Sequence, residues 1–142
     1  MADDGGSDFA RSMSIATSGL RAQAGRMRVI SENIANADST APNAGGNPYR
    51  RKVPTFSSAL DRSLDAKVVT LGKVRTDQSA FRIKHEPSNP AADAAGNVKY
   101  PNVNPLVEMT DMREAQRSYE ANLNVIGATR RMIQKTIDLL RA

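Results

Sequence analysis

Cysteine and tryptophan are absent from the 142 residues, and histidine occurs once, as His85. Without cysteine the chain has neither a disulfide framework nor a thiolate metal site. A single imidazole cannot build a histidine metal site, and His85 stands in a basic stretch where a surface position is expected. No run of 18 apolar residues occurs, so we expect no direct membrane insertion.

The common motifs of enzymes are absent as well. The sequence has no glycine-rich phosphate loop, no nucleophile elbow and no His-Glu zinc motif. The stretch NPAADAAGN, residues 89–97, lacks the carboxylate spacing of a calcium loop. Asp61 and Asp65 have the spacing of surface charges on a helix. We therefore expect no enzyme activity, no catalytic, cofactor-binding or metal-ligating residues, and no cofactor.

Aromatic residues are scarce, at 4%, which argues against an aromatic-rich core. The start, MADDGGSDFARS, has neither a basic nor an apolar region of the kind a cleavable secretory signal needs. The net charge of +5 permits an acidic partner without requiring one. Residues 105–120 hold four acids and two bases, whereas residues 121–142 hold one acid and four bases. Such an order of charges suits the dipole of one long helix.

Residues 7–37 predict a helix, with Ser7 or Asp8 as its N-cap. One heptad row along it consists of Met13, Leu20, Met27 and Ile34. A second row consists of Phe9, Ala16, Gln23, Ile30 and Ala37. Together they form a seam with one polar member, which fits an amphipathic helix on a core but favours a coiled coil. Gly19 and Gly25 inside this helix are either tolerated imperfections or places where another backbone approaches closely.

Residues 105–142 predict a second helix, with Asn104 as its cap and Pro105 at its first position. Its unbroken heptad row consists of Met112, Tyr119, Ile126, Ile133 and Leu140. Arg130 interrupts the companion row, so that turn faces outward or meets a carboxylate. The helix would be about 57 Å long, whereas a compact domain of this size is roughly 37 Å across. Its apolar row must therefore contact the first helix along part of its length and another molecule along the rest.

Residues 38–104 differ from both flanks, because they hold six of the seven prolines. Residues 67–77 and 79–86 alternate in polarity and predict two or three short strands, and residues 89–97 predict a turn. The fold class is therefore mainly α. We expect residues 1–37 and 105–142 to form an antiparallel coiled coil that serves as the assembly domain. Residues 38–104 would form a small β-rich or extended central insert.

Two other function classes remain as alternatives. A nucleic-acid-binding protein would use the basic clusters Arg50, Arg51, Lys52 and Arg130, Arg131, Lys135, together with Tyr49 and Phe56. Six bases and two aromatics are a weak signature, and a solvated face or a neighbour's carboxylates explain them better, so no nucleic acid partner is expected. A stand-alone coiled-coil adaptor would use the same two helices and form a small oligomer of defined size.

Residues 18–40, SGLRAQAGRMRVISENIANADST, resemble the N-terminal signature of the bacterial flagellar rod, hook and hook-associated axial proteins. The C-terminal stretch YPNVNPLVEMTDMREAQRSYEANLNVI, residues 100–126, is similar to the proximal rod members of this family. Three stretches of the middle also resemble these proximal rod members in order and spacing: PYRRK, DQSAF and EPSNPAADAAGNVKYPNV. The family motif falls on Asn33, Ile34, Ala35, Asn36, Pro101, Asn102, Val103, Glu108, Met109, Arg117, Ser118, Tyr119 and Asn122.

The resemblance implies a structural subunit that polymerises into the helical drive shaft of the flagellar basal body and transmits torque from motor to hook. It implies a periplasmic rod position and export without a cleavable signal by the flagellar type III export apparatus. The implied partners are copies of the chain, other flagellar rod proteins, the rod–MS-ring junction protein and the MS ring. Asn33, Asn36, Asp38 and Ser39, at the end of the first helix, would then cap it or bond to side chains and neighbouring subunits.

Overall fold

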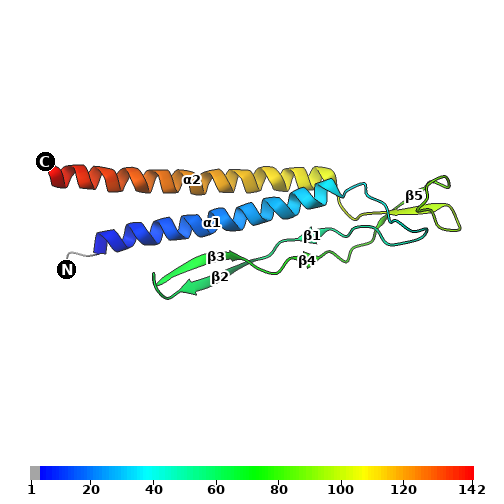
Figure 1. Cartoon of the computed structure of the whole chain (residues 1–142), viewed down its shortest axis with the longest axis horizontal. Coiled ribbons are helices and arrows are strands. Elements are labelled where there is room, and N and C mark those ends of the chain that lie inside the picture. Colours follow the sequence, from blue (N-terminus) through cyan, green and yellow to red (C-terminus); the bar gives the residue numbers. More distant parts are fainter. Residues whose placement is uncertain (1–3) are drawn as a thin grey trace. The chain divides into compact units, whose positions relative to one another are not determined.

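The computed structural model describes residues 4–142, and its two long helices are α1, Asp4–Ala35, and α2, Pro105–Arg141. The strands between them are β1, Lys52–Val53; β2, Phe56–Asp61; β3, Ala66–Leu71; β4, Arg75–Thr76; β5, Arg82–His85; and β6, Asn97–Tyr100. They form three antiparallel two-stranded ladders, which pair β1 with β4, β2 with β3 and β5 with β6. A mainly α protein with a small β-rich central region is therefore observed (Figure 1).

The predicted caps agree with the structure at the start of α2 and at the end of α1, but not at the start of α1. Asn104 caps α2, because its Oδ1 accepts from Leu106 N at 3.1 Å. At the end of α1, Asn36 Nδ2 donates to Glu32 O at 2.8 Å and Ser39 Oγ donates to Asn36 O at 2.9 Å, so both side chains cap carbonyls as expected. The predicted cap at Ser7 or Asp8 is wrong, since the helical backbone begins at Asp4 and continues through both residues.

The chain divides into two compact units. Unit 1 consists of residues 4–26, Thr55–Lys73 and Glu114–Ala142, and unit 2 consists of Met27–Pro54 and Val74–Arg113. Each unit thus takes a part of α1, a part of the central region and a part of α2. The division into residues 1–37, 38–104 and 105–142 follows the order of elements along the sequence and stays a prediction.

In unit 1, α1 contacts both the hairpin β2–β3 and α2 (Figure 1). Val69 N in β3 donates to Ser18 Oγ at 3.2 Å. A Cβ at Gly19 would lie 2.8 Å from Asn122 Nδ2, and one at Gly25 would lie 2.7 Å from Leu71 Cδ2. Both glycines therefore allow close approach, but side chains rather than another backbone occupy the space beside them.

The turn between β2 and β3 corrects the interpretation of two carboxylates. Asp61 Oδ1 accepts from Ser63 N at 2.9 Å and from Ser63 Oγ at 2.6 Å, which lowers the pKa of Asp61. Asp65 ends the turn with a φ of 47°, in the left-handed region that aspartate tolerates. These residues shape a hairpin turn, so the prediction that they share a helical surface is wrong.

One apolar cluster of unit 2 consists of Ala91, Val98 and Tyr100, against which Ala92 packs. Its hairpin β5–β6 closes through residues 89–97, the stretch for which a turn was predicted. Asp93 Oδ1 accepts from Asn97 N at 2.9 Å, and Gly96 has a φ of 77°, which favours glycine. Tyr100 donates from its hydroxyl to Glu86 Oε2 at 2.9 Å, and this bond lowers the pKa of Glu86.

Candidate functional site

Asn33 is fully buried in unit 2, near the end of α1. Its Nδ2 donates to Lys52 O at 2.8 Å and to Glu108 Oε2 at 3.1 Å. Its Oδ1 accepts from Tyr49 OH at 2.8 Å and from Lys52 N at 2.9 Å. An amide side chain has two donor hydrogens and two acceptor lone pairs, so Asn33 is satisfied on every side.

Glu108, near the start of α2, is 1% exposed and pairs with Arg51. Arg51 Nε donates to Glu108 Oε1, and its other nitrogens lie 3.7 Å from Asp77 Oδ2 and 3.6 Å from Asp111 Oδ2. Burial lowers the pKa of Arg51, but the bond to Glu108 and the charges of the carboxylates outweigh it and leave the pKa raised. The buried carboxylate is therefore paired and hydrogen-bonded, as such a group must be.

Asn102 forms hydrogen bonds with Arg51 and with the segment that contains Asp77 and Ser79. Its Oδ1 accepts from Arg51 N at 2.8 Å, and its Nδ2 donates to Asp77 O at 3.0 Å and to Ser79 Oγ at 2.9 Å. The Ser79 backbone N–H holds the pKa of Asp77 below its usual range. We call the connected set the polar cluster; it consists of Asn33, Tyr49, Arg51, Lys52, Asp77, Asn102 and Glu108.

The polar cluster is held together by hydrogen bonds and ion pairs within unit 2. Burial, followed by the charges of Glu32 and Glu108, raises the pKa of Tyr49 to about 12, so its phenol stays protonated at neutral pH. Lys52 pairs with Glu32, and each guanidinium or amide contact is internal to the unit. Within residues 4–142, no three His, Asp or Glu side chains gather where a metal ion could be held. Neither helix is apolar enough over a sufficient length to cross a membrane.

Most residues of the predicted assembly seam are half-buried. Met13, Leu20, Met27 and Ile34 of α1 are half-buried, as are Met112, Tyr119, Ile126 and Ile133 of α2. Leu140, the last member, is 82% exposed. Gln23, the polar member, has a buried Oε1 with no hydrogen-bond partner among the described residues. Arg130, which interrupts the companion row, is exposed, as the cost of burying it requires.

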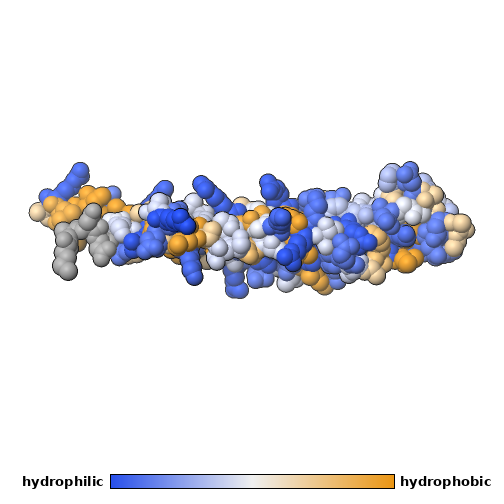
Figure 2. Space-filling view, turned by 90° about the horizontal axis from the view of Figure 1, so that it is seen from below, coloured by the Kyte–Doolittle hydropathy of each residue, from blue (hydrophilic) through white to orange (hydrophobic). Residues whose placement is uncertain are grey.

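An apolar groove lies at the end of unit 1 where α2 finishes. Phe9, Ala10 and Met13 of α1 and Ile133, Ile137 and Leu140 of α2 line most of its volume of about 610 Å³. Figure 2 shows apolar surface gathered over this end, at the left of the view.

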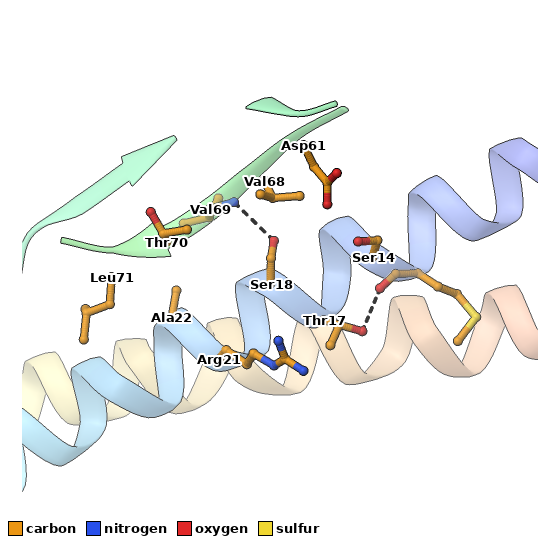
Figure 3. Close-up of a pocket in the computed structure, with 11 residues that line it drawn as sticks. Ser14, Thr17, Ser18, Arg21, Ala22, Asp61, Val68, Val69, Thr70 and Leu71 are labelled. Atoms are coloured by element: carbon orange, nitrogen blue, oxygen red, sulfur yellow. Dashed lines mark hydrogen bonds between the residues drawn. The ribbon is translucent and has the colours of Figure 1, made fainter. Parts of the chain in front are cut away.

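A second groove of unit 1, with a volume of about 490 Å³, separates β3 from α1 (Figure 3). Asp61 and Val68 line its hairpin side, and Ser14, Thr17 and Arg21 line its helix side. Thr17 Oγ1 donates to Met13 O at 2.7 Å, so its hydroxyl is already engaged. The lining is mixed, with hydroxyl, carboxylate and guanidinium groups beside apolar side chains.

Comparisons with known proteins decide the family. Residues 13–41 match the family described as "Flagella basal body rod protein", and residues 94–139 match "Flagellar basal body rod FlgEFG protein C-terminal". The flagellar basal-body rod protein FlgC of Agrobacterium fabrum is 54% identical over 128 residues, which cover 90% of this chain and 92% of the relative. The chain belongs to the flagellar basal-body rod protein family. It is a structural subunit of the basal-body rod.

More distant rod proteins match over the same extent. The FlgC protein of Bacillus subtilis is 38% identical, with 90% of this chain and 95% of the relative covered. The FlgC protein of Salmonella typhimurium is 40% identical, with 88% of this chain and 92% of the relative covered. The resemblance of the terminal stretches to flagellar axial proteins is thereby confirmed.

The structure distributes the rod-family motif between the two units. Asn33, Pro101, Val103 and Glu108 are buried, and Ile34, Asn36 and Asn102 are half-buried, all in unit 2. In unit 1, Ser118, Tyr119 and Asn122 are half-buried and Arg117 is exposed; Ala35 and Met109 of unit 2 are exposed too. The motif residues Asn33, Asn102 and Glu108 therefore meet in the polar cluster.

Arg51, Tyr49 and Lys52 have roles that sequence reasoning missed. They were considered as a basic and aromatic group for nucleic acid, but Arg51 and Lys52 are engaged by carboxylates of the same unit. Arg50 lies 4.2 Å from the ring centroid of Phe81. The only sequence feature that marks these residues is the motif PYRRK, residues 48–52. The spacing along the chain could not reveal the pairing of Arg51 with Glu108, because Glu108 lies far from this motif.

Proposed function

We propose that this rod subunit belongs to the proximal rod, where it polymerises with copies of itself and with other rod proteins into the shaft that transmits torque. Its further partners would be the rod–MS-ring junction protein, the MS ring and the type III export apparatus. The rod would stand in the periplasm, after export without a cleavable signal. The observation that carries this proposal is 54% identity to a named rod protein over 92% of that relative's length.

The assembly device would be an antiparallel coiled coil of the two terminal helices. Within unit 1, Arg26 NH2 lies 3.4 Å from Glu114 Oε2, Gly19 lies beside Asn122, and Phe9 and Ile137 line one groove. Residue numbers thus rise along α1 as they fall along α2, which supports opposite directions. The half-buried seam and the open apolar groove would then receive a neighbouring subunit.

The polar cluster supports a mechanical role for unit 2. A shaft subunit must resist torque without yielding, and buried, fully satisfied hydrogen-bond networks give a unique, rigid packing. Each member of the cluster connects segments far apart in the sequence, such as Asn33 with Lys52 and Glu108. No catalytic role is part of the proposal.

The seam can be tested with Leu20→Asp and Ile126→Asp. A carboxylate without a partner at a half-buried apolar position opposes packing, so each variant should be exported but be absent from isolated basal bodies, and swimming should be lost. His85→Ala is the control, because His85 is an exposed residue of β5 and belongs to neither helix. Normal incorporation of both Asp variants would refute the seam. Absence of the unaltered chain from isolated basal bodies would refute the function itself.

A further inference from the structure

The hairpin of β2 and β3 in unit 1 has one uncovered edge. Within residues 4–142, β2 pairs only with β3. Gly72 N donates to Thr55 O at 2.6 Å, and bonded positions of this kind recur at every second residue of an antiparallel ladder. The alternate residues Phe56, Ser58 and Leu60 therefore direct their backbone N–H and C=O groups away from β3.

The neighbouring strand shows the same alternation. Val69, opposite Ser58, donates from its backbone N–H to Ser18 Oγ of α1 at 3.2 Å, so its amide points away from β2. On β2 itself, the residues from Phe56 to Leu60 are all exposed and carry no charge. Natural edge strands usually carry charge that prevents further pairing, so an exposed and uncharged edge is a template for another strand.

Unit 2 has the second uncovered edge, on β5. Glu86 N donates to Gly96 O at 2.9 Å, which fixes the alternation of bonded positions in the hairpin β5–β6. Ile83 and His85 therefore direct their backbone groups away from β6. All four residues of β5 are exposed, and Ile83 is 66% exposed.

The outer edge of β6 is engaged within unit 2. Asn97 N donates to Asp93 Oδ1, and Asp93 N donates to Asn97 O, both at 2.9 Å. Among the longer strands of residues 4–142, β2 and β5 are thus the two whose outward backbone groups all lack a hydrogen-bond partner in the chain. Each unit carries one such edge.

We propose that β2 of one copy pairs with β5 of a neighbouring copy in the assembled rod, as an antiparallel strand contact. The contact rests on the proposed function, because it is one through which copies of the chain polymerise. With Ser58 opposite Ile83 and Phe56 opposite His85, the outward backbone groups of both strands meet in bonded pairs. The contact uses the backbone of His85 and not its imidazole, so His85→Ala leaves it intact.

The side chains of the two strands fit together in this register. Directly opposed residues of antiparallel strands share a face of the sheet, as do residues two apart on one strand. Ile83 would cover the small Ser58 and lie between Phe56, which is 44% exposed, and Leu60, which is 57% exposed. Val69 lies opposite Ser58 on β3 and is exposed too. The contact therefore buries apolar side chains that are open to water in the single chain.

Pairing of like strands fits a shaft less well. Two β5 strands centred on Ile83 would set Arg82 of each copy against Lys84 of the other, and like charges directly opposite destabilise a sheet. Two β2 strands would use the same edge on both copies and close at two. A contact between β2 and β5 leaves a free β5 on one copy and a free β2 on the other, so it propagates from subunit to subunit.

Cysteine pairs test the contact in isolated basal bodies, because the native chain has no thiol. Opposed residues in bonded pairs have Cα atoms about 5.5 Å apart, which a disulfide can span. Rods built from a Ser58→Cys, Ile83→Cys chain and oxidised mildly should give disulfide-linked dimers and larger multiples of the chain. Rods built from either single variant should give none.

Ser57→Cys with Ile83→Cys is the matched control, since the side chain of Ser57 lies on the opposite face of the hairpin. Three results would overturn the contact: no intersubunit product from the Ser58→Cys, Ile83→Cys chain, an equal yield in the control, or dimers from Ser58→Cys alone. Absence of the unaltered chain from basal bodies would instead refute the proposed function. Its presence without the crosslink would refute the strand contact only.

Proline at residue 58 gives a second readout. Ser58→Pro removes the outward N–H and spares the bonds between β2 and β3, since proline is tolerated where the N–H of an edge strand faces outward. It should lower the amount of the chain in isolated basal bodies about fivefold or more, because a backbone hydrogen bond to β5 is lost. Ser58→Ala keeps the N–H and should be incorporated like the unaltered chain. Normal incorporation of Ser58→Pro, or an equal loss in Ser58→Ala, would contradict the pairing.

Discussion

At the scale of single residues, the unusual feature is a buried amide and a buried carboxylate that share a hydrogen bond. Asn33 and Glu108 are each 1% exposed or less, and they join the end of α1 to the start of α2 inside unit 2. Burial is costly for both groups unless every polar atom is paired. Their partners are the side chains of Tyr49 and Arg51 and the backbone of Lys52, so the stability of unit 2 depends on these groups acting together.

Replacement of Glu108 by Ala should lower the free energy of unfolding by about 2 to 4 kcal/mol, because it leaves Arg51 and Asn33 without their acceptor. Urea denaturation followed by circular dichroism measures the change. Glu120→Ala, on the exposed side of α2, serves as the matched control and should change stability by less than about 0.5 kcal/mol. Equal effects of the two substitutions would show that the polar cluster contributes little.

Tyr49 should make stability fall at alkaline pH. Its pKa is about 12 in the folded chain against 10.0 for the free side chain, so the folded state holds the phenolic proton more tightly. The associated stabilisation is complete below pH 10 and is lost as the pH rises from 10.0 to about 12. Tyrosinate absorbance should show a phenol that titrates near the upper value and disappears in Tyr49→Phe. A transition near pH 10 for every tyrosine would contradict the burial of this ring.

At the scale of elements, two glycines of α1 allow side chains of α2 and β3 to lie close to its backbone. A side chain at Gly19 would collide with Asn122 of α2, and one at Gly25 would collide with Leu71 of β3. Each glycine costs about 1 kcal/mol of helix propensity relative to alanine. The cost is offset by contacts on two faces of the helix, with α2 and with the hairpin.

The α1–α2 contact predicts a specific crosslink. A Gly19→Cys, Asn122→Cys chain should form a disulfide within one molecule when oxidised, because a Cβ at residue 19 would lie 3.0 Å from Asn122 Cγ. The product should run at monomer mass on a non-reducing gel and faster than the reduced chain. Gly19→Cys with Glu120→Cys, one of whose positions faces away, is the control. A disulfide that forms only between molecules would mean that the helices pair across copies.

At the scale of the whole molecule, both long helices extend through two units that are stabilised differently. In unit 2, α1 contributes the buried Val29, Ile30 and Asn33. In unit 1, the last turns of α2 bury no residue: Leu139 and Leu140 are exposed, and Ile133 is only half-buried. Isolated helices are marginal in water, so a segment's stability should follow its packing rather than its helix propensity.

Hydrogen exchange on the dilute full chain should therefore separate parts of the same helices. Backbone amides of residues 27–35 in α1 should be protected, whereas those of residues 133–141 in α2 should exchange quickly, since their local opening exposes little further apolar surface. Mass spectrometry of peptic peptides resolves the two segments. Equal protection of both would show that the end of α2 is held by contacts of its own.

Prediction from sequence succeeded where local pattern is sufficient. The heptad rows predicted both helices, Asn104 and Pro105 predicted the start of α2, and Asn36 and Ser39 predicted the end of α1. It failed for Asp61 and Asp65, because the i, i+4 spacing that suits a helix also spans a hairpin turn. The strands β1, β2 and β6 were not predicted, and β1 and β6 each pair with a segment more than ten residues away.

The sequence by itself determined the family, the two helices and the absence of thiol chemistry, since these depend on residue identity and on periods of seven. The tertiary structure decided what those residues do. Only the fold brings Asn33, Arg51 and Glu108 into one buried cluster, since 57 residues separate Arg51 from Glu108 along the chain. Only packing shows that one apolar row of α2 is half-buried while another is exposed, because periodicity marks a helix face but not the surface that covers it.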